Sequence, residues 1–457
     1  NMSNDAENEY FSDGIAEELI NSLSKIGGLQ LTCRASSFSF KGRNQDVREI
    51  GRALNVSKVL EGSVRKAGNR VRITTELVNT ADGYQLWSET FDRNLNDIFE
   101  LQDEIAGLIC NRMRQQMVCK IVETPEPSQN IEAYHLYLKG LFFFNKGTPP
   151  GYYKAIQLFD EAVALDPSFA NAHAMIASCY SALTSEGNVN PATGMERAKT
   201  ASRNAIRLNS QLPQSYLSMA MLQLYFEFQF DEALNNINKA FLIAPDSSEA
   251  HYVASHYYMI INDKKRMVEE AELALRSDPL SLMKNNQLGE TLLYARRHDD
   301  AERQLIKTLE LDPGWRTPLR NLAFVNIALG NYQKSFEIFD RIRREVNQPG
   351  KGITGYIVAL SLLGKKDEAY TWLKQIHRRA EEDPNAPMYS DFICCYAVLG
   401  DMDKTFYYLN LAYEKHGGSI FFVIRYPINT FLKKDERFWQ LLERMGLKKY
   451  YEDERND

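Results

Sequence analysis

The sequence contains neither a long apolar run nor a concentrated basic stretch. No uninterrupted hydrophobic stretch approaches the ~18 residues that a membrane-spanning helix needs. Acidic residues slightly outnumber basic ones, with a formal net charge of −6, and no basic tract stands out. We therefore expect no membrane span in this chain and no direct nucleic-acid binding by this region.

Paired cysteines and catalytic motifs are also missing. None of the six cysteines forms a C-x-x-C pair, so the sequence predicts neither a disulfide framework nor a zinc site. The adjacent Cys394 and Cys395 are expected to be buried thiols. There is no Walker-type glycine loop, no G-x-S-x-G and no H-E-x-x-H, and His251 and His256 are spaced too far apart for one helix face. We expect no catalytic residue, metal or cofactor in this chain.

What the chain has is the composition and length of a multidomain globular protein. It contains 457 residues, of which 44% are hydrophobic and 25% charged. Residues 1–117 alternate helical and strand patterns, and residues 118–130, which include Pro125 and Pro127, are predicted to be a linker. From Ile131 onward the pattern is helical throughout.

The first region predicts a small α/β domain with a mixed sheet. An apolar stripe starting near Ser12 predicts a helix that ends at Gly27-Gly28. The remaining predicted elements are a strand at 29–34, a helix at 47–54, a hairpin of 59–66 and 70–78, a strand at 85–91, and a helix at 97–117. Trp87, Phe91, Phe99 and Ile105 are expected to form its core.

Three arginines lie near the tip of the predicted hairpin. Arg65, Arg70 and Arg72 are able to hold an anionic ligand there, or they form a solvated end of the hairpin. A ligand pocket between the sheet and the last helix of this region is a further alternative.

A repeat of about 34 residues fills the last two-thirds of the chain. Helix-ending prolines fall at Pro245, Pro279 and Pro313, at steps of 34 residues. In the first unit the spacing A-x3-F-x2-A-x4-P runs from Ala155 to Pro167, which resembles a tetratricopeptide repeat (TPR). The resemblance implies about eight units over residues 131–416, forming an all-α superhelix, and a capping helix and tail over residues 417–457.

Stacked units of this kind line an inner groove with the first helix of each pair. The positions that correspond to the groove of the TPR family are Glu249, Tyr252, His256, Asn286, Glu290, Arg320 and Phe324. Asn, Arg, His and aromatic side chains suit an extended peptide with some acidic character. The alternative is that they are solvated side chains of the inner surface.

The first region resembles the TolB-like amino-terminal domain of bacterial multidomain signalling proteins. The matching phrases are YFSDG at 10–14, LEGSVR at 60–65, RVRI at 70–73, LWSE at 86–89, FDR at 91–93, DIF at 97–99 and QDEI at 102–105. In that family the domain commonly precedes a TPR array and follows an output module, namely a winged-helix domain, a class III nucleotide cyclase or a kinase. Members also have a strand before the segment that matches Asn1–Ser3, and neither that strand nor an output module is found here.

The sequence therefore predicts a non-catalytic sensory or scaffolding region that binds a protein or peptide partner in the TPR groove. By resemblance, it passes that event to an upstream module. One alternative is the regulatory part of an enzyme such as a class III adenylate cyclase, and another is a small-molecule sensor in the α/β domain. The sequence does not decide whether the chain forms a homodimer. The resemblance favours a periplasmic over a cytoplasmic location, although unpaired cysteines argue against it.

Overall fold

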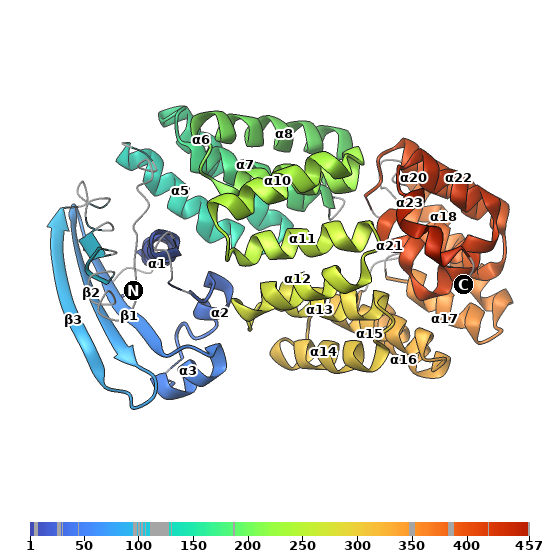
Figure 1. Cartoon of the computed structure of the whole chain (residues 1–457), viewed down its shortest axis with the longest axis horizontal. Coiled ribbons are helices and arrows are strands. Elements are labelled where there is room, and N and C mark those ends of the chain that lie inside the picture. Colours follow the sequence, from blue (N-terminus) through green and yellow to red (C-terminus); the bar gives the residue numbers. More distant parts are fainter. Residues whose placement is uncertain are drawn as a thin grey trace.

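The computed structural model describes residues 1–3, 8–24, 29, 31–43, 45–94, 98, 101, 104–105, 107–109, 128, 130–185, 188–346, 352–382, 388–418 and 420–455. A small α/β unit lies at one end of a long array of paired helices and also reaches its middle (Figure 1). None of the helices in the described part is long and apolar enough to cross a membrane.

The α/β unit has three described strands in one antiparallel sheet, in the order β1-β2-β3. The predicted hairpin is confirmed, and Gly68, with φ +59°, supplies the left-handed conformation that its tight turn requires. The elements are α1 (Glu9–Ser24), α2 (Arg34–Phe38), α3 (Val47–Leu54), β1 (Lys58–Ala67), β2 (Arg70–Asn79) and β3 (Gln85–Asn94).

One face of this sheet packs into the core. Along β2 buried and more exposed residues alternate, so that Val71, Ile73 and Leu77 point inward. Trp87 and Phe91 of β3 are buried with them, as predicted. These residues belong to one hydrophobic cluster with α1 and with the first helix pair of the array. The α/β unit and the start of the array therefore share a core.

The end of this region lies mostly outside the described residues. Of the helix predicted over residues 97–117, residues 98, 101, 104–105 and 107–109 are described, and they are helical. Ile105 is buried as expected, whereas Phe99 is outside the described part. The predicted linker is outside it too, except for residues 128 and 130.

The strand predicted at Leu29–Arg34 is not formed by the described residues of that segment. Helix α2 begins at Arg34, and the described sheet is antiparallel throughout rather than mixed. The backbone N–H groups of Cys33 and Ser36 are bound to Ser277 and Asp278, far along the chain. Because these donors are taken by the helix array, they are not available to a neighbouring strand.

The array consists of helix pairs that follow one another along the chain (Figure 1). The pairs are α5 (Ile131–Phe144) with α6 (Pro149–Leu165), α7 (Ala170–Ser185) with α8 (Pro191–Leu208), α9 (Pro213–Leu222) with α10 (Phe230–Ile243), α11 (Ser248–Ile260) with α12 (Lys264–Arg276), α13 (Leu282–Tyr294) with α14 (His298–Leu311), α15 (Arg316–Ala328) with α16 (Tyr332–Glu345), α17 (Thr354–Leu362) with α18 (Lys366–Glu382), and α19 (Tyr389–Leu399) with α20 (Met402–Glu414). A π-helical turn, η3 (Gln223–Glu227), extends α9.

Small residues allow the two helices of a pair to approach closely. A Cβ atom at Gly140 of α5 would lie 2.4 Å from the ring of Phe159 in α6, and one at Gly289 of α13 would lie 2.5 Å from Leu305 in α14. Phe159 and Leu305 are fully buried. The same kind of contact occurs in these two units because the TPR spacing places a small residue opposite a large one.

The C-terminal segment does more than cap the last pair. It contains α21 (Ile420–Arg425), η4 (Pro427–Lys434), α22 (Glu436–Arg444), α23 (Lys448–Tyr451) and η5 (Glu452–Glu454). The hydroxyl of Tyr451 donates to the carbonyl of Ile260 at the end of α11 (3.1 Å), and Phe421 packs edge-on against Phe228 after η3. The segment thus returns to the middle of the array (Figure 1).

We predict that Gly140→Ala lowers the melting temperature of the protein. Overpacking a core costs about 1–3 kcal/mol, which exceeds the roughly 1 kcal/mol that alanine gains over glycine in a helix. Thermal unfolding followed by circular dichroism measures the effect. Gly107→Ala is the control, since Gly107 is helical and an added Cβ meets no atom of a described residue within 4 Å. Equal melting temperatures for the two variants would contradict the close approach.

We predict that Glu454 stabilises the packing of the C-terminal segment against the array in a pH-dependent way. Burial alone would raise the pKa of Glu454, but hydrogen bonds from Lys264 of α12 and Lys433 of η4 outweigh burial and lower it to about 2. Because the folded-state pKa is depressed, the stabilisation is complete above the unfolded pKa of about 4.3 and is lost as the pH falls toward 2.

Glu454→Gln should therefore reduce stability at pH 7 by up to about 3 kcal/mol, and the difference from the parent protein should shrink below about pH 4.3. Urea unfolding at a series of pH values measures this difference. Glu452→Gln, at an exposed neighbouring position, should leave stability unchanged at every pH. If the stability difference between Glu454→Gln and the parent protein stayed constant down to pH 3, the charge of the carboxylate would not be what holds the segment.

Candidate functional site

The first helices of the pairs form one continuous surface of the array. Consecutive first helices contact one another from α5 to α15 and again from α17 to α19. The C-terminal segment lies on this surface, because η4 contacts α15 and α19 and α21 contacts α19. We call this surface the inner face. All seven predicted groove residues lie on its helices α11, α13 and α15.

The predicted groove residues differ in accessibility. Glu249 and Arg320 are exposed and Tyr252 is half-buried. The other four, which are His256, Asn286, Glu290 and Phe324, are each at most 8% exposed. The prediction that all seven line an open groove therefore needs correction for these four side chains.

The buried four are covered or bound by other residues of the chain. Tyr426, which follows α21, stacks on Phe324 with ring centroids 4.3 Å apart. His256 is hydrogen-bonded to Tyr225, and burial lowers the pKa of His256 to about 4. Two further bonds hold the remaining side chains, from Tyr294 to Glu290 (3.0 Å) and from Asn321 to Asn286 (3.1 Å).

The open part of the inner face carries an available cation. Arg320 makes no hydrogen bond or ion pair with a described residue, although Tyr426 and then Glu290 raise its pKa. Burial raises the pKa of Glu290, and its carboxyl group accepts a hydrogen bond from Tyr294 rather than from Arg320. The guanidinium is thus free to bind a carboxylate or another acceptor in two parallel hydrogen bonds.

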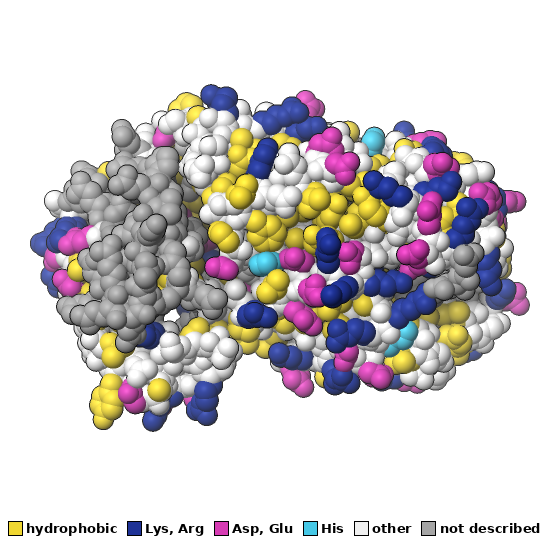
Figure 2. Space-filling view, viewed as in Figure 1, with side chains coloured by type: hydrophobic (Ala, Val, Ile, Leu, Met, Phe, Trp, Pro, Cys, Tyr) yellow, Lys and Arg dark blue, Asp and Glu magenta, His cyan; other side chains and the backbone are white. Residues whose placement is uncertain are grey.

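Charges of both signs are mixed on the visible surface of the array. In Figure 2 lysine, arginine, aspartate and glutamate alternate over the array, and hydrophobic side chains gather over α10 and α11. No group of three or more His, Cys, Asp or Glu side chains within the described ranges is placed to hold a metal ion. Cys394 and Cys395 are buried, as expected.

The three hairpin arginines do not form an isolated cationic cluster. Arg70 and Arg72 both bind the carboxylate of Asp92 on β3, with shortest distances of 2.6 Å. Arg65 lies opposite Arg72 in the sheet register and its side chain reaches the carbonyl of Met2 (3.4 Å). An anion at this place would have to displace Asp92 from two arginines.

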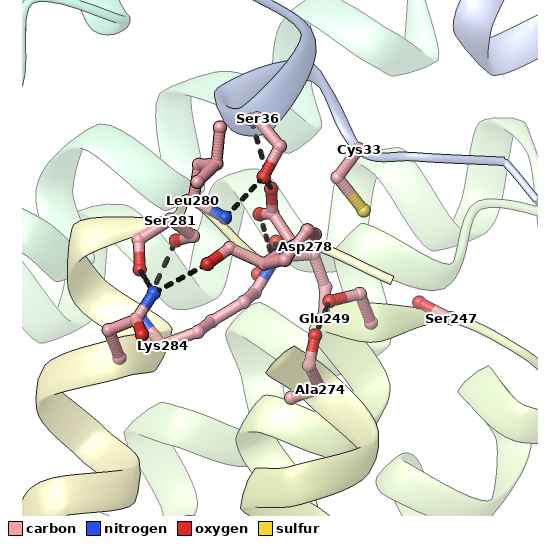
Figure 3. Close-up of polar contacts among 12 residues, drawn as sticks. Cys33, Ser36, Ser247, Glu249, Ala274, Asp278, Leu280, Ser281 and Lys284 are labelled. Carbon is pink, nitrogen blue, oxygen red and sulfur yellow. Dashed lines mark hydrogen bonds and ion pairs between the residues drawn. The ribbon is translucent and has the colours of Figure 1, made fainter. Parts of the chain in front are cut away.

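A buried polar joint, which sequence reasoning missed, connects the α/β unit to the array. Its centre is Lys284 of α13, whose side chain is 4% exposed (Figure 3). Its ammonium binds Asp278 in the turn between α12 and α13 (2.8 Å) and Glu249 of α11 (2.6 Å). Asp278 in turn accepts hydrogen bonds from the backbone (3.0 Å) and the hydroxyl (2.6 Å) of Ser36 in α2. We call this set of contacts the joint.

The electrostatics of the joint follow from its burial. Burial alone would lower the pKa of Lys284, but Glu249 and Asp278 outweigh it and raise the pKa, so the ammonium stays charged. Cys33 lies beside these groups, and burial raises the pKa of its thiol to about 11. The thiol is therefore protonated and unreactive near neutral pH.

One sequence signal pointed to part of this joint. Glu249 and Lys284 are 35 residues apart, close to one repeat, so opposite charges occupy equivalent places in neighbouring first helices. No sequence pattern pointed to Ser36, because no helix was predicted between the strand at 29–34 and the helix at 47–54. Its partner Asp278 is 242 residues away.

A protein of known sequence and several solved structures are similar to parts of this chain. No model of a protein family matches the chain. A Rhizobium meliloti (strain 1021) protein named "Putative adenylate cyclase 3" is 37% identical over 238 residues, which make up 51% of this chain and 40% of that protein. The chain thus spans less than half the length of this relative.

Among solved structures, a thermophilic TPR protein of Thermus thermophilus is 18% identical and covers 43% of this chain and 99% of its own, with a TM-score of 0.37. A tetratricopeptide repeat protein of Parabacteroides merdae is 15% identical and covers 55% of this chain and 93% of its own, with a TM-score of 0.39.

We predict that Lys284→Met destabilises the protein by about 3–5 kcal/mol, because Asp278 would stay buried without its cation. Urea unfolding measures this change. The control is Lys334→Met, which removes the exposed pair of Lys334 with Glu302 and should cost at most about 1 kcal/mol. If both variants lost the same small amount of unfolding free energy, the buried ion pair would not be important for stability.

Proposed function

We propose that this chain is a non-catalytic regulatory region of a bacterial signalling protein. Its TPR array binds a protein or peptide partner on the inner face. Its α/β unit, which resembles a TolB-like domain, passes the binding event to an output module elsewhere in the protein. The observation that carries this proposal is that the α/β unit is attached to the array at two separate places.

The first attachment is apolar and close. A Cβ atom at Gly14 of α1 would lie 2.7 Å from Leu138 of α5, and the amide of Asn145 donates to Glu17 (3.0 Å). The second attachment is the joint at the turn between α12 and α13. Between these places lie three and a half repeat units, from α6 to α12. Because the α/β unit is attached at both ends of this stretch, a change in the curvature of the stretch acts on the α/β unit. A partner that changes the curvature when it binds would thereby signal to the α/β unit.

The accessible charges of the inner face indicate the kind of partner. Arg320 suits an acidic group and Glu249 suits a basic one. A partner with charges of both signs would match these two positions, and complementary charges fix orientation and register more than they add affinity. An extended peptide that follows the first helices would contact both residues.

The regulatory part of an adenylate cyclase is a more specific version of this proposal. It is supported by the 37% identity to the Rhizobium meliloti protein over about half of this chain. Cyclic AMP formation by the complete gene product, with and without substitutions on the inner face, tests this version. Absence of a cyclase segment from the complete gene product would exclude it. A periplasmic location is part of the proposal and is tested by a reporter enzyme fused to the C-terminus.

We predict that Arg320→Glu weakens partner binding at least about tenfold and leaves the melting temperature nearly unchanged. The binding probe is a set of fluorescent 12-residue peptides of graded acidity, measured by anisotropy. Lys307→Glu, at an exposed position of α14 away from the inner face, makes the same charge change and should bind the peptides normally.

Two outcomes would contradict this prediction. A fall of many degrees in the melting temperature of Arg320→Glu would show that Arg320 has a structural role. Equal loss of affinity in Arg320→Glu and Lys307→Glu would show that only the net charge of the array matters.

A further inference from the structure

Within the described part of the array, three turns begin with the same dipeptide, Asp-Pro, and two of them are closed in the same way. In the turn after α6, Asp166 accepts a hydrogen bond from the backbone N–H of Ser168 (3.0 Å). In the turn after α14, Asp312 accepts one from the backbone N–H of Gly314 (2.9 Å). Each aspartate thus binds the N–H group two residues after it, which is a common way to stabilise a turn.

The third turn, which begins at Asp278, is closed by a residue from the α/β unit. The hydroxyl of Ser36 donates to Oδ1 of Asp278 (2.6 Å) and accepts from the backbone N–H of Leu280 (2.8 Å). The hydroxyl therefore stands between the carboxylate and the N–H group two residues later, where the sister turns have a direct bond. Figure 3 shows Ser36 reaching into this turn from α2.

A second arrangement of the turn would also give each of its buried polar groups a hydrogen-bond partner. If α2 withdrew, Oδ1 of Asp278 would accept directly from the N–H of Leu280, as in the sister turns. Oδ2 of Asp278 would keep its bond to Lys284 (2.8 Å). The backbone N–H groups of Cys33 and Ser36, now bound to this turn, would be solvated instead, and so would the carbonyl of the half-buried Ser277.

We propose that the contact of α2 with this turn is a releasable latch with two states. In the closed state Ser36 is inserted between Asp278 and Leu280. In the open state the turn closes on itself, while α1 keeps the α/β unit on α5. Such a two-state element is what a conformational switch needs, because each state satisfies its own polar groups.

The latch is connected to the inner face through one ion-pair chain. Lys284 binds Asp278 at the latch and Glu249 on the inner face, and Glu249 is 54% exposed. A partner that engages Glu249 changes the charge balance around Lys284 and hence at Asp278. The role of the latch in signalling rests on the proposed function. The existence of the two states does not depend on the proposed function.

The attachment through α1 is not releasable in the same way. Phe11 and Ile15 of α1 are at most 1% exposed and belong to the core shared with the first helix pair. Withdrawal of α1 would expose this apolar surface to water, and no alternative packing replaces it. The latch is therefore expected to open while α1 stays in place.

Hydrogen exchange of the whole chain carrying Ser36→Ala, without any partner, tests the latch. Ser36 is fully buried and alanine fits its place, so the variant removes only the hydroxyl. We expect the amides of residues 33–38 to exchange at least about tenfold faster, a change of the size of one net hydrogen bond. The amide of Leu280 should stay protected because Asp278 accepts it, and the melting temperature should hardly change.

Two further variants complete the test. Ser168→Ala removes a hydroxyl that binds Asp166 (2.5 Å) in a sister turn, and it should leave the exchange of residues 33–38 unchanged. Asp278→Ala removes the carboxylate that holds Ser36 in the closed state and that would accept the N–H of Leu280 in the open state. The amide of Leu280 should therefore lose protection, and the melting temperature should fall.

The latch would be overturned by either of two results. One is unchanged exchange of residues 33–38 in Ser36→Ala. The other is a loss of protection of Leu280 in Ser36→Ala that is as large as in Asp278→Ala. That result would show that the turn does not close on itself when Ser36 is not inserted. Because no partner is present, these results are independent of whether the inner face binds the peptides used with Arg320→Glu.

Discussion

The buried ammonium group of Lys284 is the interaction on which the arrangement of the two parts of the chain depends. A charge with so little access to water is tolerated only when carboxylates lie beside it. Lys284 has two, Asp278 in the turn that receives α2 and Glu249 in the preceding repeat. Buried ion pairs are a weak source of net stability, and we infer that this one serves to specify which turn of the array α2 contacts.

The C-terminal segment limits how much of the inner face a partner can reach. Tyr426 covers Phe324, and Phe421 packs against the aromatic residues around η3, so this part of the inner face belongs to the core. Glu249 and Arg320 remain accessible. The array is thus not an open groove along its whole length, and recognition is confined to the part that the C-terminal segment leaves uncovered.

The errors of the sequence-based prediction share one physical cause. The stretch from Leu29 to Arg34 has the apolar character of a strand, yet the backbone donors of Cys33 and Ser36 bind a distant turn and α2 begins at Arg34. Likewise, the spacing of the repeat placed Phe324 on the inner face correctly but did not show that Tyr426 covers it. In both cases a contact distant in sequence overrode a local pattern.

Local sequence patterns were sufficient to predict the hairpin and the helix pairs. A turn glycine such as Gly68 and a small residue opposite a large one, as with Gly140 and Phe159, act over a few tens of residues at most. Where α2 docks and how the C-terminal segment closes the inner face depend on the tertiary structure. The bonds that fix these features join residues 242 apart, from Ser36 to Asp278, and 191 apart, from Tyr451 to Ile260. No periodicity records such contacts, since they depend on the curvature that the whole array adopts once its helices have packed.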